Sequence, residues 1–273
     1  MQDVTASKPS DGSRDGQDEI DAARAPLIEH LTELRTRLIH SLFGFLAMFV
    51  VCFYFAKPIY NILVGPFVRV VGADKAKLIA THFLEQLYTN IKLAMFGAAF
   101  LAFPLIAYEI YKFVAPGLYK NEREAFRPYL FATWVLFLLG ALVVYFVVMP
   151  LLIQFSVDIT PQAGGQGQAA IELLPKVSEY LSLIMQLILG FGIIFQLPVI
   201  LTLLARAGAL DSVALVTFRR YAIFGIAAVS AVLSPPDPFS MIAMMMPTML
   251  LYEASIFIVR RIEKQNAAPP AKT

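Results

Sequence analysis

The sequence predicts an all-α membrane protein with six transmembrane helices and both termini in the cytoplasm. Of its 273 residues, 58% are hydrophobic and only 15% are charged, whereas soluble domains are about 45–50% apolar and about 25% charged. Several runs free of Asp, Glu, Lys and Arg approach the ~20 residues that a helix needs to cross a bilayer. Sixteen of the 22 Lys and Arg residues fall on the side of the two termini, which the positive-inside rule assigns to the cytoplasm.

Three parts follow one another along the chain. Residues 1–25 are polar and rich in Asp, Ser and Gly, so we expect a disordered cytoplasmic tail. Residues 26–260 form the predicted membrane domain, and residues 261–273 form a second cytoplasmic tail. The net charge of +2 is too small, and the basic residues are too scattered, to indicate nucleic-acid binding.

The membrane domain opens with "PLIEHLTELRTRL", residues 26–38. Its leucines recur at positions 27, 31, 34 and 38, which is the spacing of one apolar stripe on a helix. We expect this amphipathic helix to lie on the cytoplasmic surface before the chain enters the bilayer.

The six spans follow from the uncharged runs. They are expected at Leu38–Ala56, Leu93–Tyr108, Pro128–Val157, Tyr180–Ala205, Tyr221–Pro236 and Pro238–Tyr252. The last two are separated only by Asp237 in "LSPPDPFS", whose prolines favour a tight turn, and their 16 and 15 residues make them short. The two longer outside connections contain "VGPF" and "PQAGGQGQ", which we interpret as turn material.

Glu33 and Arg37 carry the first functional question. They are four residues apart in the favourable order for a helical ion pair, which contributes only ~0.3–0.5 kcal/mol when exposed. The alternative is that an acid beside the membrane binds a cationic ligand.

Other polar residues also have two interpretations. Glu122 follows a capping Asn121 and complements a helix dipole, and Phe113 is typical of interfacial aromatics. Glu109 and Glu253 lie near the cytoplasmic ends of their spans. Each has two equally favoured interpretations, as a functional group or as a solvated helix end.

Two further polar residues lie in or beside the later spans. Gln196, two residues before Pro198, could hydrogen-bond carbonyls freed by the proline or a neighbouring span. Asp237 between prolines is most simply a turn residue.

Several blocks, in order, make the sequence similar to the TatC family, the receptor component of the twin-arginine protein translocase. They are "PLIEHLTELRTRL", "IKLAMFGAAFLAFPLIAYEIYKFVAPGLYKNER", "GALVVYFVVMPL", "FGIIFQLPV" and "LSPPDPFS". The resemblance implies a non-enzymatic receptor in the bacterial inner membrane that binds paired arginines in the signal peptides of folded cargo. It also implies self-association and assembly with single-span TatB and TatA proteins for export driven by the proton-motive force, without a cofactor or a metal.

The resemblance also implies site residues. The signal-binding acids fall on Glu33 and Glu122, with Arg35 and Phe113 beside them. Gln196 departs from a frequent glutamate, which puts a proton-carrying role in doubt but leaves a polar contact to a partner helix possible. Met241 stands where some members have glutamine.

Other classes of function have less support. The chain has no HExxH, serine-elbow or phosphate-loop motif, and its three histidines are far apart in sequence, so no catalytic site is indicated. One cysteine permits neither a disulfide nor a thiolate metal site within the chain. A transporter or channel would need more polar groups at mid-membrane, and a passive scaffold gives no reason for paired cytoplasmic acids.

Overall fold

The computed structural model describes residues 12–118, 126–159, 174–234 and 238–267. Ten α-helices and one π-helical turn follow each other in these ranges: α1 (Gly12–Tyr54), α2 (Ala56–Val71), α3 (Glu85–Leu118), α4 (Phe126–Val143), η1 (Val144–Val148), α5 (Met149–Ile159), α6 (Val177–Ile194), α7 (Leu197–Arg206), α8 (Ser212–Thr217), α9 (Arg219–Leu233) and α10 (Pro238–Ala267). The expected all-α class is therefore confirmed for the described part of the chain.

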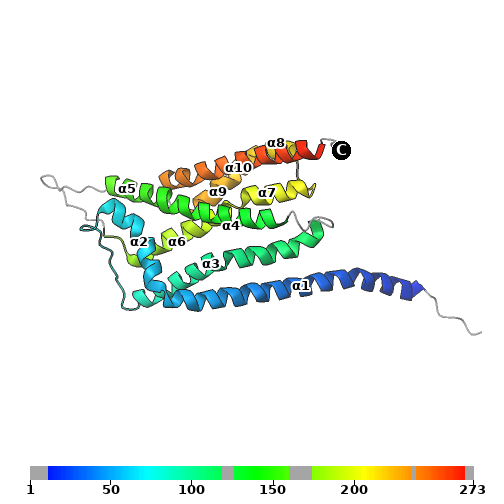
Figure 1. Ribbon diagram of the computed structural model, residues 1–273, viewed down its shortest axis with the longest axis horizontal. Helices are drawn as coiled ribbons and strands as arrows, with labels where there is room; N and C mark the ends of the chain where they lie inside the picture. Colours follow the sequence, from blue (N-terminus) through cyan, green and yellow to red (C-terminus); the bar gives the residue numbers. More distant parts are fainter. Residues whose placement is uncertain (1–11, 119–125, 160–173, 235–237, 268–273) are drawn as a thin grey trace, which may run out of the picture.

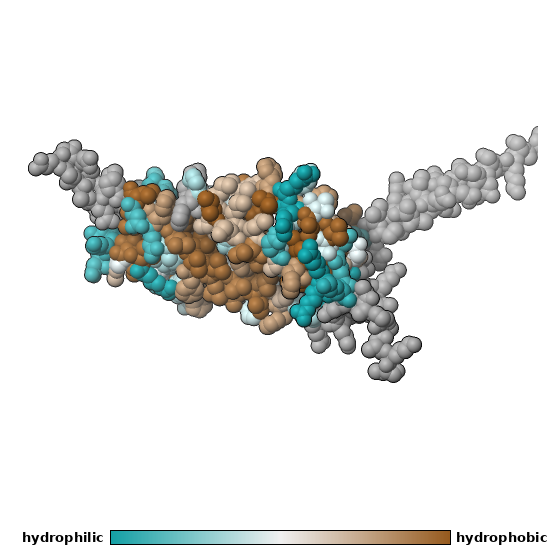
Figure 2. Space-filling model, turned by 90° about the horizontal axis from the view of Figure 1, so that it is seen from above, coloured by the Kyte–Doolittle hydropathy of each residue, from teal (hydrophilic) through white to brown (hydrophobic). Residues whose placement is uncertain are grey.

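Five of the described helical segments are long and apolar enough to cross a membrane. They are His30–Tyr54, Glu85–Phe113, Pro128–Ile159, Val177–Arg206 and Ser240–Lys264. The expected fifth span corresponds to α9, whose 15 residues rise only about 22 Å. Figure 2 shows a belt of apolar residues between two polar ends, as a bilayer requires.

The beginning of the chain differs from expectation in two ways. Helix α1 starts at Gly12, within the segment for which we expected a disordered tail, and it runs unbroken to Tyr54. The predicted surface helix and first span are thus one helix, because no Gly or Pro interrupts residues 27–43. Figure 1 shows this long helix packed along α3.

The interpretation of "VGPF" as turn material was wrong, because Gly65 and Pro66 lie inside α2. Pro66 cannot donate a backbone hydrogen bond to the Ile62 carbonyl four residues earlier. The Tyr145 hydroxyl donates to that carbonyl instead, at 2.9 Å. A side chain of η1 thus compensates for the proline that argued against a helix.

The main core lies where α2, α3, α6 and the α4–η1–α5 rod meet. Leu93, Val144 and Leu181 are almost fully buried there. Helices α4 and α6 approach closely because Gly140 has no side chain: a Cβ atom there would lie 2.9 Å from the Phe191 carbonyl oxygen. A smaller cluster around Val259 joins α8, α9 and α10.

Candidate functional site

The candidate site lies on the facing surfaces of α1 and α3. His30, Glu33, Arg37 and His40 occur at i, i+3, i+7 and i+10, so they share one face of α1. This polar face packs toward α3, whereas Leu31, Leu34 and Leu38 are 63%, 43% and 66% exposed. The apolar stripe therefore points away from the protein, where lipid can cover it.

Arg37 connects two acids from different helices. Its Nη2 donates to Glu33 Oε1 at 3.0 Å, and its Nη1 donates to Glu109 Oε2 at 3.2 Å. The side chain of Glu109 is only 9% exposed, and that of Glu33 is 34% exposed. The predicted Glu33–Arg37 pair is confirmed, but it forms part of a three-residue network.

The network leaves hydrogen-bonding groups free among the described residues. Glu33 uses one carboxylate oxygen, and the buried Nε of Arg37 has no partner. An open depression lies beside Thr32, Glu33, Thr36 and Arg37. With two carboxylates and one guanidinium, the network has a formal charge of −1 when both histidines are neutral, which suits a cationic ligand.

An aromatic stack lies one turn away. The rings of His30 and Phe113 are stacked with centroids 4.3 Å apart and an interplanar angle of 22°. His40 Nδ1 lies 3.8 Å from Glu109 Oε1, on the other side of the network. No sequence pattern indicated these contacts directly, although the spacing on α1 would have indicated that His30 and His40 share a face with Glu33.

The other expected site residues lie elsewhere. Arg35 is exposed and lies about 200° around α1 from Glu33, without a partner among the described residues. Glu122 and Asp237 fall outside the described residues. Glu253 forms an ion pair with Arg219 of α9, and its side chain is 38% exposed.

Glu109 is not a solvated helix end, because it is 93% buried and paired with Arg37. Gln196 makes the expected hydrogen bond to a neighbouring span, but its other bond goes to Gly192 and not to the Ile194 carbonyl that Pro198 leaves without a donor. Its side-chain amide donates to the Gly192 carbonyl of α6 and to the Thr133 carbonyl of α4, each at 3.1 Å. Its Oε1 has no partner among the described residues.

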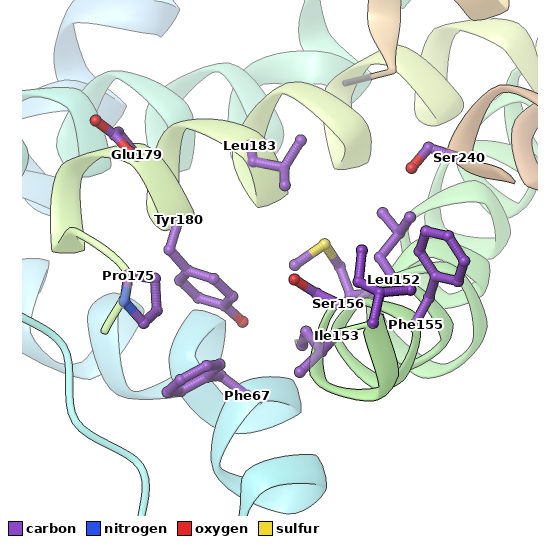
Figure 3. Close-up of a pocket in the computed structure, with 12 residues that line it drawn as sticks. Phe67, Leu152, Ile153, Phe155, Ser156, Pro175, Glu179, Tyr180, Leu183 and Ser240 are labelled. Carbon is purple, nitrogen blue, oxygen red and sulfur yellow. The ribbon is translucent and has the colours of Figure 1, made fainter. Parts of the chain in front are cut away.

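A cavity of about 350 Å³ is lined by residues of α2, α5 and α6 (Figure 3). Helices α2 and α5 lie at the end of the molecule away from the start of α1 (Figure 1). Figure 3 shows Phe67 and Tyr180 on one side of it and Ile153 and Ser156 on the other. The Tyr180 hydroxyl donates to the Leu63 carbonyl. Because the lining is mostly apolar, this cavity offers few groups to coordinate a polar solute.

The sequence matches the family model "Sec-independent protein translocase protein (TatC)" over residues 29–247. Its relatives include the TatC proteins of Magnetococcus marinus (41% identity, over 91% of this chain and 89% of that protein) and Aquifex aeolicus (37%, over 85% and 94%). The TatC protein of Escherichia coli K12 is 33% identical over 86% of this chain and 88% of its own length.

The fold is similar to a crystal structure of the twin-arginine translocase receptor TatC. The TM-score is 0.74 at 36% identity, over 85% of this chain and 98% of that one. Family model, relatives and fold agree over most of the chain, and the chain belongs to the TatC family of Sec-independent protein translocase components.

Proposed function

We propose that this chain is the receptor subunit of a twin-arginine translocase, with Glu33 and Glu122 binding the two arginines of an export signal. The observation that carries the proposal is the α1–α3 network: Arg37 fixes one oxygen of Glu33 and leaves the other free beside an open depression. The comparison with a solved twin-arginine translocase receptor supports the same function.

The chemistry of the proposed contact is specific for arginine. A guanidinium group presents parallel N–H donors that match a carboxylate, whereas an ammonium group acts as a point charge. Arg37 restrains Glu33, so less side-chain entropy is lost when a ligand binds. The Phe113 ring stacks on His30 near Glu33, and it is proposed to contact the apolar part of the signal. Arg35 is proposed to contact the same peptide.

Binding of a fluorescent signal peptide to detergent-purified protein tests the proposal. Glu33→Gln and Glu122→Gln should each weaken binding by roughly 1–3 kcal/mol, the range for hydrogen bonds to charged groups. A twin-lysine peptide should bind the parent less well than a twin-arginine peptide, and the difference should shrink in the variants.

Glu179→Gln is the matched control, because Glu179 also pairs with a nearby cation, Lys176, but lies on α6 at the far end. Equal affinity of the parent for the two peptides, or an unaltered preference in a well-folded Glu33→Gln/Glu122→Gln protein, would contradict the proposal.

We also propose six spans in a bacterial inner membrane, with α9 as the short fifth span and both termini in the cytoplasm. The support is the Lys and Arg distribution and the position of the start of α1 and the end of α10 at one end of the molecule (Figure 1). In a Cys52→Ala background, Asp74→Cys should react with an impermeant thiol reagent added to intact cells. Lys264→Cys should stay protected, and the reverse pattern would overturn this orientation.

Assembly with TatA- and TatB-like single-span proteins, and self-association, belong to the same proposal. We propose three polar groups for these helix contacts: the free Oε1 of Gln196, Glu253 and Asp237. A small-solute transporter is not favoured, because two cavities between the described helices are lined mainly by apolar side chains.

A further inference from the structure

An apolar cleft of about 430 Å³ lies where α1, α2, α3 and α4 meet. Its walls include Cys52 of α1, Ile59 of α2, Phe100 of α3 and Leu138 of α4. Tyr145 also lines it, but its hydroxyl is used in the hydrogen bond to the Ile62 carbonyl. A ligand inside the cleft must therefore be apolar.

The cleft opens on the outside of the helix bundle. Ile62, Leu101 and Phe146 line it and are 60%, 54% and 56% exposed. Leu101 and Phe146 belong to helical segments long and apolar enough to span a membrane. In a chain that spans a bilayer, the opening faces the acyl chains of lipids.

A cation lies beside this opening. The guanidinium carbon of Arg69, in the last turn of α2, is 5.3 Å from the centroid of the Tyr145 ring and 5.4 Å from that of Phe146. Arg69 is exposed. Among the described residues, no carboxylate lies within ion-pair distance of it. Cation–π contacts thus hold a positive charge that has no counterion in this part of the chain.

We propose that the cleft binds one anionic phospholipid, with an acyl chain along the cleft and its phosphate on Arg69. Apolar walls and an adjacent unpaired cation are complementary to the two parts of this molecule. A docking helix fits less well, because a helix about 10 Å wide fills roughly the volume of the cleft in one 5.4 Å turn. The inference rests on the chain spanning a membrane and is independent of signal recognition.

Fluorescence quenching by brominated lipids tests the site. Trp134 is the only tryptophan of the chain, so a Trp134→Phe/Leu142→Trp protein reports from the cleft wall. In phosphatidylcholine bilayers, brominated phosphatidylglycerol should bind beside this reporter roughly fivefold more strongly than brominated phosphatidylcholine, the factor for one cation near an anionic headgroup. Arg69→Gln should remove the preference, and Arg69→Lys should retain part of it.

Three controls separate the cleft from the general surface. Lys57→Gln removes another exposed cation of α2 and should leave the preference unchanged. Ala141→Phe keeps Arg69 but fills the cleft, so it should reduce the preference. A Trp134→Phe/Leu250→Trp reporter, at a 69% exposed position of α10, should show no dependence on Arg69.

Three results would overturn the proposal. Equal quenching by both lipids at the Leu142→Trp reporter, or a preference that survives Arg69→Gln, would show that Arg69 does not select a lipid. Weak quenching by both lipids would show that protein covers the cleft, as a second copy of the chain or a partner helix would.

Discussion

Arg37 compensates the charge of an acid that the fold has removed from solvent. Glu109 is 93% buried between α1 and α3, where a carboxylate without a partner would be costly. The same guanidinium group also holds Glu33, which remains one-third exposed. Structural and recognition roles of these acids are therefore compatible: Glu109 fixes Arg37, and Arg37 orients Glu33.

This division of roles predicts how the network responds to substitution. Arg37→Gln should lower the melting temperature of the purified protein, because it leaves Glu109 buried without a cation. Glu109→Gln in the same chain should restore part of the loss, since the uncompensated charge disappears. Differential scanning fluorimetry in detergent measures both effects.

Arg35→Gln supplies the control, because Arg35 is exposed and has no partner among the described residues. It should change the melting temperature less than Arg37→Gln does. If the double variant melts below the Arg37→Gln protein, Glu109 stabilises the fold in a way that does not depend on Arg37.

At the scale of single residues, the sequence showed one half of the network. The Glu33–Arg37 spacing predicted their contact because both lie on one helix. The Arg37–Glu109 contact joins positions 72 residues apart, and it depends on which face of α1 turns toward α3. The leucine stripe alone did not decide this, because in a membrane the apolar face of a helix can face lipid while the polar face packs inside.

Where the helical hydrogen-bond pattern is interrupted, side chains from other parts of the chain bond the backbone carbonyls that are left without a donor. In α2, Pro66 frees the Ile62 carbonyl, which accepts a hydrogen bond from Tyr145. Between α6 and α7, the Gln196 backbone N–H bonds the Ile193 carbonyl three residues back, and its side chain takes the Gly192 carbonyl. Carbonyls without partners would be costly inside a bilayer, so these side chains fix where the chain can kink.

Gln196→Leu should therefore destabilise the protein, although it replaces a polar side chain inside the membrane by an apolar one. It removes two hydrogen bonds, and bonds of this kind in membranes are worth about 0.6 kcal/mol on average and at most about 1.7 kcal/mol. We expect a loss of roughly 1–2 kcal/mol in the free energy of unfolding. Denaturant titration in micelles, followed by Trp134 fluorescence, measures it.

Gln186→Leu is the comparison, because Gln186 is exposed on α6 and makes a single longer bond, 3.3 Å, to the Leu233 carbonyl. It should cost clearly less. Equal losses from the two variants would mean that the buried bonds of Gln196 add nothing to stability.

At the scale of elements, long uncharged runs predicted the five long apolar helices well, because composition alone decides whether a helix can lie in lipid. Helix α2 was missed because Gly65 and Pro66 argue locally for a turn. Its helical form depends on Tyr145, which lies 80 residues beyond Gly65 and 79 beyond Pro66. A local pattern cannot show such a compensating partner.

The whole molecule combines one long helix, α1, with one very short one, α9. Helix α1 packs mainly against α3 and leaves much of its apolar surface exposed. Helix α9 has 15 residues and begins with Arg219 and Arg220. The apolar part of α9 is thus shorter than the ~30 Å hydrocarbon layer, as its uncharged run already indicated.

The short α9 motivates the proposal that lipid thins beside it and lowers the barrier where cargo crosses. Four leucines inserted after Ala228 add about 6 Å of apolar helix and rotate the following residues by only about 40°. The variant should insert and assemble normally, while the fraction of a twin-arginine precursor that reaches the periplasm should fall in cells that carry it as the sole copy.

Four serines inserted at the same position provide the matched control, because they impose the same rotation and displacement without extending the apolar length. Export by the serine variant should exceed export by the leucine variant at equal membrane levels of the two proteins. Equal loss in both would assign the defect to helix packing. The lengthened helix of the leucine variant should match the bilayer, so lipid beside it should no longer thin. Undiminished export by a stably inserted leucine variant would therefore show that thinning at α9 is not part of the mechanism.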